Sequence, residues 1–359
     1  MTDSPKIAAF SLKPRKAVAE LTPYTPGEQP KRRMIKLNTN ENPYPPSPRV
    51  TEALAKLSPE SIRKYPDPVG EALLQALSVD HRVPPRQTIL TNGSDEILRL
   101  AAEAYVEPGE KVGYLWPTYS LYPLFVEKAG GVEVRIPWMD RTPEEALLDA
   151  PKDLKVLYIA NPNPPIGKVV GLDTLRQVAQ ARPETLVVVD EAYIFFGGDT
   201  AMEIVAEGTT PNLMVTRTYS KSHSLAGLRV GFGSCSPEVA DVLYRIKDSY
   251  NVSAAGQAAA LAVREDQAYT RNTVHCIRAT RKRLTHDLRV MGFEVEDSQG
   301  NFVFAKCRDA KGLFQYLREK DILVRYFETP ELHDGLRITI GTDKEIDALI
   351  EALRDRLRP

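Results

Sequence analysis

The chain has 359 residues, of which 42% are hydrophobic and 26% are charged, and its formal net charge at pH 7 is -1. This composition is ordinary for a soluble globular protein, and such balanced charge argues against nucleic acid or anionic membrane as the main partner. The length exceeds that of one compact core, which predicts two domains, or one large domain with a smaller one appended.

The sequence gives no sign of a metal site, a disulfide framework or a membrane span. The three cysteines, Cys235, Cys276 and Cys307, are odd in number and form no C-x-x-C pair, which favours a reducing, cytoplasmic compartment. The five histidines lack metal-ligand spacing. No apolar run is long enough to cross a bilayer, and the N-terminus lacks the apolar segment of a signal peptide.

Three regions are predicted along the chain. Residues 1–48 are rich in proline, which removes backbone donors and disfavours helix in the preceding residue, so they are expected to form an extended arm. Residues 49–262 are predicted to form a large α/β domain, and residues 263–359 a smaller α+β domain.

Apolar strands alternate with helical segments in the large domain. Strands are predicted at 111–115, 132–136, 155–160, 186–190 and 213–216, and helices at 97–105, 173–180 and 237–247. This alternation predicts a mostly parallel sheet with helices on both faces.

The C-terminal region is predicted to begin with a long helix over 267–291. Strands are expected at 301–305 and 336–340. Thr342 and Glu345 form a capping-box pattern, and the helix that follows carries Ile346, Leu349, Ile350 and Leu353 on one face.

Two segments at the predicted ends of elements could bind a ligand, because ligands of open parallel sheets bind beyond the carboxyl ends of the strands. Asp190 follows the apolar run LVVV, where it could cap a loop, bind a sugar hydroxyl or pair with a protonated heterocyclic nitrogen. Asn92–Glu96 precedes a helix, where it could cap the helix or expose N–H groups to a phosphate.

Lys221 lies in the sequence TYSKSHSLAGLRVGF among hydroxyl side chains, with Arg229 close behind. An arginine can clamp a phosphate with two hydrogen bonds, and a lysine near other cations has a lowered pKa that frees its amine to act as a nucleophile. Schiff-base chemistry needs such an amine, a phosphate cradle and an acid for a ring nitrogen. The chain offers all three: Lys221 as the amine, Ser94 with Arg229 as the phosphate cradle, and Asp190 as the acid.

With these residues in place, the sequence resembles the fold-type-I pyridoxal-phosphate-dependent aminotransferases, most closely the histidinol-phosphate aminotransferase subfamily. The resemblance covers nearly the whole chain. It is carried by the following segments: LTPY (21–24), LNTNENPYP (37–45), KYPD (64–67), NGSDE (92–96), PTYSLY (117–122), NPNPPIG (161–167), VVDEAY (188–193), SKSHSLAGLRVGF (220–232) and LRITIGT (336–342).

The resemblance implies a role for each of the catalytic residues. Lys221 would hold pyridoxal 5'-phosphate covalently and then move a proton between the substrate carbon and the cofactor carbon. Asp190 would keep the pyridine nitrogen protonated. Tyr193 would hydrogen-bond the phenolic oxygen of the ring, and Tyr119 would stack on its face.

The resemblance also implies how the anionic groups are bound. The cofactor phosphate would be held by the backbone and hydroxyl of Ser94, the backbone of Asp95, the hydroxyls of Thr218 and Ser220, and Arg229. Tyr65 would reach the phosphate of the neighbouring subunit's cofactor, which makes the active unit a homodimer. Arg337 would bind the carboxylate of glutamate or 2-oxoglutarate, and Tyr24, Asn301 and Arg325 are candidates for the phosphate or distal group of the amino donor.

Two positions depart from the family pattern. The family often reads N-N-P-T-G, where the asparagine before the proline binds the ring oxygen; here Pro164 and Ile166 replace the asparagine and the threonine, and Asn163, one residue earlier, is the candidate substitute. His223 replaces the small apolar or aromatic residue of many relatives. It could tune the site or be a packing variation.

Several functions share these motifs. The first is transamination of L-histidinol phosphate with 2-oxoglutarate, in histidine biosynthesis. An aromatic amino-acid aminotransferase and a threonine-phosphate decarboxylase are alternatives of the same cofactor class. A non-catalytic nucleotide-binding regulator on a similar scaffold would not need Lys221, and the sequence has neither G-x-G-x-x-G nor G-x-x-x-x-G-K-[ST].

Overall fold

The fold is that of a computed structural model, which describes residues 12–14, 16–19, 21, 23, 24 and 26–358. Residues 1–11, and Thr22 of the LTPY sequence, lie outside the described residues, so the expectations about the start of the chain are tested only in part. Within the described part, no helix has both the length and the apolar character needed to cross a membrane.

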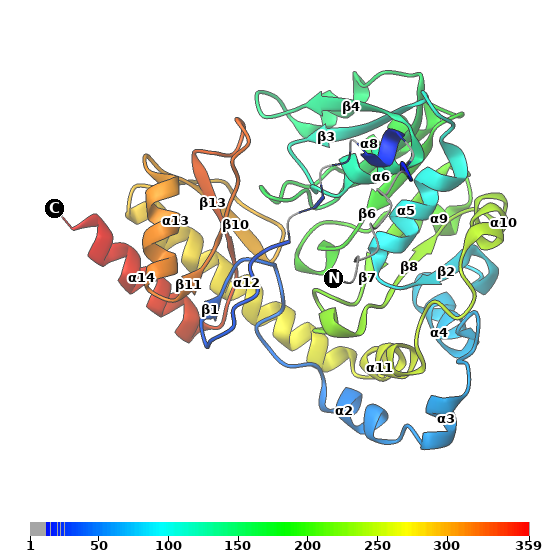
Figure 1. The fold of residues 1–359 in the computed structure, drawn as a ribbon, viewed down its shortest axis with the longest axis horizontal. Coiled ribbons are helices and arrows are strands. Elements are labelled where there is room, and N and C mark those ends of the chain that lie inside the picture. The colour runs from blue at the N-terminus through cyan, green and yellow to red at the C-terminus, as the bar shows by residue number, and fades with distance from the viewer. Residues whose placement is uncertain (1–11, 15, 20, 22, 25, 359) are drawn as a thin grey trace, which may run out of the picture.

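The larger part of the chain is built on a seven-stranded sheet with the order β2-β8-β7-β6-β5-β3-β4 (Figure 1). Its strands are β2 (Thr88–Thr91), β3 (Lys111–Trp116), β4 (Val132–Pro137), β5 (Leu154–Ala160), β6 (Leu186–Asp190), β7 (Leu213–Thr218) and β8 (Gly231–Ser234). The prediction of a mostly parallel sheet is confirmed, since only β8 runs antiparallel to its neighbours.

Helices cover both faces of this sheet because its central strands are apolar on both sides. Leu157 and Ile159 of β5 pack into one core, and Val156 and Tyr158 into the other. The first core includes side chains of α4 (Glu71–His81), α7 (Pro143–Leu148), α8 (Leu172–Gln180), α9 (Met202–Glu207) and α11 (Ala254–Glu265). The second includes α5 (Ser94–Tyr105), α6 (Tyr122–Ala129) and α10 (Pro237–Ile246). A strand that is buried on both faces has apolar residues at successive positions, which explains the continuous apolar runs in the sequence.

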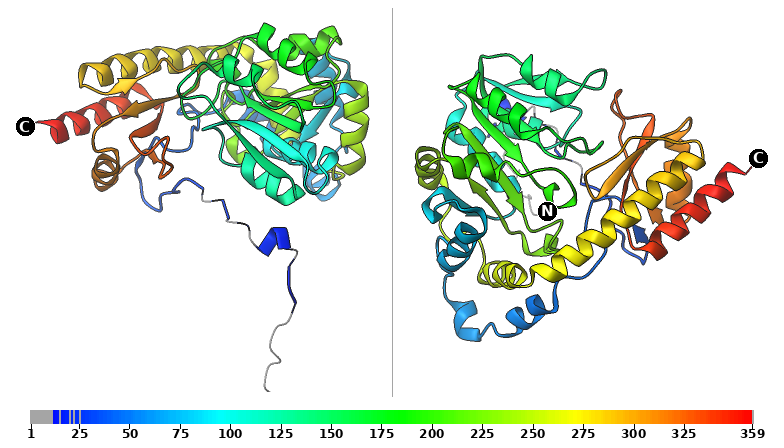
Figure 2. Two further views of the ribbon diagram at one scale, coloured as in Figure 1. Left: turned by 90° about the horizontal axis from the view of Figure 1, so that it is seen from above. Right: turned by 180° about the vertical axis from the view of Figure 1, so that it is seen from behind.

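A second, antiparallel sheet with the order β12-β13-β10-β9 forms the smaller part. Its strands are β9 (Glu294–Val295), β10 (Phe302–Lys306), β12 (Arg325–Tyr326) and β13 (Gly335–Thr339). Its helices are α13 (Ala310–Glu319) and α14 (Asp343–Leu357), and the predicted capping box of Thr342 and Glu345 opens α14. The 24-residue helix α12 (Gln267–Val290) runs from the large sheet to this one (Figures 1 and 2). The boundaries at residues 48 and 262 remain a prediction.

The N-terminal arm is tied to the smaller part at its end. Strand β1 (Ile35–Lys36) pairs in parallel with β11 (Ile322–Leu323), and the backbone N–H of Thr339 donates to the carbonyl of Leu37 at 3.0 Å. The arm also contains α1 (Lys16–Ala19), whose backbone lies beside α6. The pairing carries residues 38–40 to the gap between the two sheets.

Short helical segments complete the fold. They are α2 (Pro48–Ala55), α3 (Pro59–Arg63), η1 (Pro85–Gln87), η2 (Ile194–Phe196) and η3 (Ala226–Leu228). Helices α2 and α3 each start at a serine whose hydroxyl accepts a backbone N–H, with proline at the first helical position, which is a common way to begin a helix.

Candidate active site

Nine of the predicted cofactor-binding residues line one cavity at the carboxyl ends of the large sheet's strands. Asp190 ends β6, Thr218 ends β7, Lys221 follows β7, and Ser94 opens α5. The nine are Ser94, Asp95, Tyr119, Asp190, Tyr193, Thr218, Ser220, Lys221 and Arg229. Parallel strands bring their carboxyl ends to one edge, so residues far apart in sequence meet here.

Asp190 is buried and held by three donors. Its carboxylate accepts hydrogen bonds from the Tyr122 hydroxyl at 3.0 Å, the Ala192 N–H at 3.2 Å and the Thr216 hydroxyl at 3.3 Å. Burial raises the pKa of Asp190 to about 6, and these donors offset only part of that effect. None of the described groups that bond this carboxylate is a cation, and a protonated ring nitrogen can supply one.

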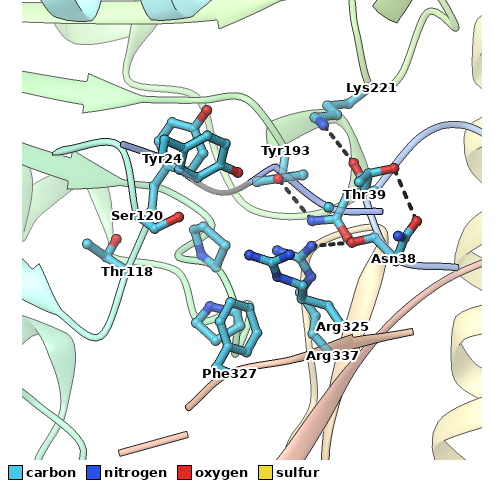
Figure 3. Close-up of a pocket in the computed structure, with 15 residues that line it drawn as sticks. Tyr24, Asn38, Thr39, Thr118, Ser120, Tyr193, Lys221, Arg325, Phe327 and Arg337 are labelled. Carbon is cyan, nitrogen blue, oxygen red and sulfur yellow. Dashed lines mark hydrogen bonds between the residues drawn. The ribbon is translucent and has the colours of Figure 1, made fainter. Parts of the chain in front are cut away.

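The Lys221 amine lies between the two halves of the site. Its Nζ donates to the carbonyl of Thr39 in the arm at 3.2 Å and lies 5.9 Å from the centre of the Tyr193 ring (Figure 3). Burial and, to a smaller extent, the charge of Arg337 lower the pKa of Lys221 to about 8, against an opposite effect from Glu41. The lowered pKa was expected, but burial contributes more to it than neighbouring cations.

An anion cradle lies at the N-terminus of α5. Arg229 donates to the hydroxyl of Ser220 at 3.1 Å and to the Asp95 carboxylate at 3.2 Å. Two glycines allow this close approach: a Cβ on Gly93, whose φ is +79°, would lie 2.4 Å from Nη2 of Arg229, and one on Gly231 would lie 2.5 Å from the Ser94 nitrogen. Free N–H groups of a helix N-terminus with an arginine and hydroxyls suit a phosphate.

Two tyrosines border the cavity with their hydroxyls held in place. The Asn40 amide donates to the Tyr193 hydroxyl at 3.0 Å, which leaves the Tyr193 proton free for another acceptor. Tyr119 donates to the Asp95 carboxylate at 2.9 Å. Burial raises the pKa of both tyrosines, so they remain protonated near neutral pH.

A second cavity continues from the first and shares Tyr119, Pro164, Tyr193 and Lys221 with it. Among its other lining residues are Tyr24, Arg325, Phe327 and Arg337 (Figure 3). The guanidinium carbons of Arg325 and Arg337 lie 5.5 and 5.6 Å from the centre of the Phe327 ring. None of the described residues that line this cavity is a carboxylate.

Arg337 is available to an anion. Its Nη2 donates to the carbonyl of Asn38 at 2.7 Å, while its buried Nε has no partner among the described residues. Burial lowers the pKa of Arg337, and the nearby Arg325 adds to this effect. Two neighbouring arginines in a cavity whose described lining contains no carboxylate favour a ligand with more than one negative charge.

Three predicted site residues do not reach these cavities. Asn163 is buried, but its amide donates to the carbonyl of Pro117 at 3.0 Å and its oxygen accepts from the Thr118 hydroxyl, so its side chain is engaged away from the cavity. Asn301 donates to the Asn40 carbonyl at 3.0 Å and supports the arm instead. Tyr65 is 81% exposed and stacks on Tyr250.

The sequence did not single out three residues that complete the site. Tyr122 bonds Asp190, Asn40 bonds Tyr193, and the carbonyl of Thr39 accepts from Lys221. Tyr122 and Asn40 lie inside the PTYSLY and LNTNENPYP segments, so the segments were recognised while these partners were not. Their contacts span 68 and 153 positions of the chain, and no local pattern indicates such pairs.

The sheet, the lysine after β7 and the buried aspartate together define an enzyme of the fold-type-I pyridoxal-phosphate-dependent class. The family model for aminotransferase class I and II matches residues 32–353. Histidinol-phosphate aminotransferase 1 of Trichormus variabilis is 44% identical over 351 residues, which cover 96% of this chain and 99% of that protein. Histidinol-phosphate aminotransferase 2 of Thiobacillus denitrificans is 43% identical, over 94% and 96% of the two chains.

A solved structure is similar over the same length. Histidinol-phosphate aminotransferase from Sinorhizobium meliloti, in complex with pyridoxal-5'-phosphate, superposes with a TM-score of 0.88 at 27% identity and covers 98% of both chains. The present chain belongs to the class I and II aminotransferase family, and within it to the histidinol-phosphate aminotransferases.

Proposed function

We propose that the chain transfers an amino group from L-histidinol phosphate to 2-oxoglutarate, with pyridoxal 5'-phosphate as cofactor. The observation that carries this proposal is the pair Arg325 and Arg337 in a cavity whose described lining has no carboxylate. The amino donor brings a phosphate and no carboxylate, whereas the acceptor brings two carboxylates. One cationic cavity can serve both, because a guanidinium binds either group with two hydrogen bonds.

The residues of the first cavity fit the cofactor. Its phosphate would be held by Ser94, the backbone N–H of Asp95, Thr218, Ser220 and Arg229, and its phenolic oxygen would accept from the Tyr193 hydroxyl, which itself accepts from Asn40. When bound, pyridoxal 5'-phosphate supplies an electron-accepting ring that stabilises negative charge on the substrate carbon. Asp190 keeps a proton on the ring nitrogen, since a buried carboxylate is stabilised by a cation beside it.

Lys221 attaches the cofactor and then carries the proton. With a pKa of about 8, a fraction of its amine is unprotonated near neutral pH, which lets Nζ act as nucleophile and as base. Its contact with the Thr39 carbonyl holds the amine at the junction of the two cavities. Because Lys221 lines both cavities, its amine can attach the cofactor in one and reach the substrate in the other.

The test is a half-reaction that follows the visible absorbance of the bound cofactor. Histidinol phosphate, phenylalanine and phosphothreonine are added separately to the holoenzyme without an amino acceptor. We expect the absorbance to change at the lowest concentration with histidinol phosphate. A preference for phenylalanine supports an aromatic aminotransferase, and release of CO₂ from phosphothreonine supports a decarboxylase.

A second test concerns Lys221 itself. The variant Lys221→Ala is expected to fold and to lose transamination, and borohydride treatment of the wild-type holoenzyme should fix the cofactor on a peptide that contains Lys221. Full activity of Lys221→Ala, or labelling of another lysine, would end the assignment.

We further propose that the enzyme acts as a cytoplasmic homodimer. The exposed Tyr65–Tyr250 pair, with ring centres 4.5 Å apart, does not line the cavities of its own chain, so it is available to a neighbouring subunit. Cys235, Cys276 and Cys307 are free thiols, which is typical of a reducing compartment.

A further inference from the structure

A separate cavity of about 600 Å³, open to solvent, lies behind the segment that carries Lys221. It is bordered by the end of α4, by η2, by β7 with the residues after it, and by the first half of α12. The proposed transamination assigns it no role. Its lining consists of an aromatic wall and a cationic rim.

The wall is a continuous row of five aromatic rings. The ring centres of His81 and Phe232 lie 5.8 Å apart, those of Phe232 and Tyr219 6.1 Å, those of Tyr219 and His223 4.9 Å, and those of His223 and Phe195 4.8 Å. Burial lowers the pKa of His81 to about 4 and that of His223 to about 3, so both rings are neutral at pH 7. This wall suits a flat apolar or aromatic group.

The rim is positively charged and comes from one face of α12. Arg271, His275 and Arg278 follow one another at helical spacing, and all three are exposed. Asp80 is the one carboxylate among the described lining residues, and Arg264 binds it through two hydrogen bonds of 3.0 Å. Arg217 forms an ion pair with the buried Glu191, to whose carboxylate its Nε donates at 2.9 Å. No described carboxylate pairs with Arg271 or Arg278, so the charges of these two arginines are left for a ligand.

We propose that this cavity binds a small molecule with a flat aromatic ring and an anionic group. The ring packs against the aromatic wall, and the carboxylate or phosphate is bound by Arg271 and Arg278. An aromatic surface with a few placed polar groups is the usual composition of a small-molecule site. Nothing in this assignment depends on which amino donor the enzyme uses.

The cavity also touches the active site through a shared wall. Arg217 and Tyr219 face the new cavity, Ser220 and Lys221 face the cofactor cavity, and Thr218 borders both. The His223 ring bonds the hydroxyl of Ser222, the residue next to Lys221, at 2.8 Å. A ligand against Tyr219 and His223 therefore acts on the backbone that positions Lys221, and His223 acquires a role that the transamination does not give it.

Binding is tested on the holoenzyme with three aromatic anions: 1-anilinonaphthalene-8-sulfonate, followed by its fluorescence, and AMP and indole-3-acetate as competitors. We expect saturable binding of the fluorescent probe and its displacement by both competitors, with adenosine and inorganic phosphate at least about tenfold weaker, because each lacks one of the two contacts. If none of the three aromatic anions binds saturably, the proposal is wrong.

Matched variants locate the site. Arg278→Glu is expected to weaken binding at least about tenfold, whereas Lys282→Glu makes the same charge change one turn further along α12, on an exposed residue outside the lining, and should leave it unchanged. Neither residue belongs to the catalytic machinery, so both variants should retain transamination. Equal affinity in both variants, or displacement of the probe by histidinol phosphate alone, places the probe elsewhere and overturns the assignment.

The shared wall is tested by the cofactor spectrum. Saturating AMP should shift the pH at which the visible band of the wild-type holoenzyme changes, and the shift should be absent in Arg278→Glu. A shift that persists in Arg278→Glu would assign the effect to the cofactor cavity and remove the proposed coupling.

Discussion

Burial sets the acid–base behaviour of the two side chains that matter most in this site. Asp190 and Lys221 both lie in the cavity beyond the large sheet, and in each case loss of contact with water is the largest influence on the pKa. Burial disfavours the charged form of each group, which is the carboxylate of Asp190 at higher pH and the ammonium of Lys221 at lower pH. The cofactor-free protein should therefore show two separate signatures in its stability.

The first signature belongs to Asp190. Its pKa is raised to about 6 in the folded protein, so the stability it contributes is complete below its unfolded pKa and is lost as the pH rises through about 6. We expect cofactor-free wild type to lose on the order of 1–2 kcal/mol relative to Asp190→Asn between about pH 5 and about pH 7.5. Urea unfolding at both pH values measures the difference. A difference that does not change with pH contradicts the buried-carboxylate assignment.

The second signature belongs to Lys221. Because its folded pKa is lowered to about 8, its contribution to stability is present above the unfolded pKa and is lost as the pH falls through about 8. Cofactor-free wild type should therefore gain on the order of 1–3 kcal/mol relative to Lys221→Met as the pH rises from about 7 to about 10. Lys282→Met, at an exposed position, is the control and should show no such trend.

Individual site residues were predicted well where a segment carries a distinctive local pattern and poorly where a distant contact decides. Nine cofactor residues share one cavity as expected. Asn163 was expected to bind the ring oxygen, but Thr118 and Pro117 engage its amide group. The sequence shows which hydrogen-bonding groups Asn163 has, while the fold around it determines which partners those groups meet.

At the scale of elements, the approach of β8 to the start of α5 shapes the anion cradle. Gly231 lies where a Cβ would come within 2.5 Å of the Ser94 nitrogen and 2.6 Å of the Gly93 carbonyl carbon, both of which belong to the backbone. Backbone atoms cannot rotate away as a flexible side chain can. The two elements can meet only if this position is glycine.

A substitution at Gly231 should therefore affect the cofactor more than its distance from the reacting atoms suggests. We expect Gly231→Ala to destabilise the protein by about 1–3 kcal/mol and to weaken cofactor binding, because it displaces Ser94. Gly227→Ala is the matched control, since nothing lies within 4 Å of its added Cβ. Thermal unfolding and cofactor titration measure both effects, and equal behaviour of the two variants would falsify this explanation.

Elements were predicted with different success for a physical reason. Strand β6 matches its predicted range, because a run of buried apolar residues identifies a central strand. Strand β8, with the sequence GFGS, was not predicted, since glycine has low strand propensity and the strand is fixed by pairing with β2 and β7. Local propensity thus identifies the central strands and not the one that tertiary pairing stabilises.

At the scale of the whole molecule, the proposed dimer places Tyr65 in the site of the neighbouring subunit. Lys221→Ala and Tyr65→Ala should each reduce activity as homodimers. Mixed dimers, refolded together, contain one site with both native residues, so we expect them to recover activity. The control mixes Lys221→Ala with Asp190→Asn. Because both changes affect the same chain's cavity, each hybrid site keeps one defect, and no recovery is expected.

The exposure of Tyr65 in the single chain fits a role in the site of the neighbouring subunit. Tyr65 is 81% exposed in the single chain, and its ring rests on Tyr250 from the loop before α11. If the mixed dimers recover nothing, Tyr65 has a role within its own chain, and the dimer proposal loses its main support.

The sequence by itself determined the fold class, the large mostly parallel sheet, the long helix α12 and the capped last helix, and it singled out Lys221, Asp190 and Arg229 as candidate site residues. These follow from local patterns: apolar periodicity, capping residues and short segments around the reactive groups. Only the tertiary structure decided that Asn40 holds Tyr193, that Tyr122 holds Asp190, that Asn163 is engaged elsewhere, and that an aromatic cavity lies behind Lys221. Such contacts join residues far apart in the chain, and their geometry is fixed only when the sheets and the arm pack together.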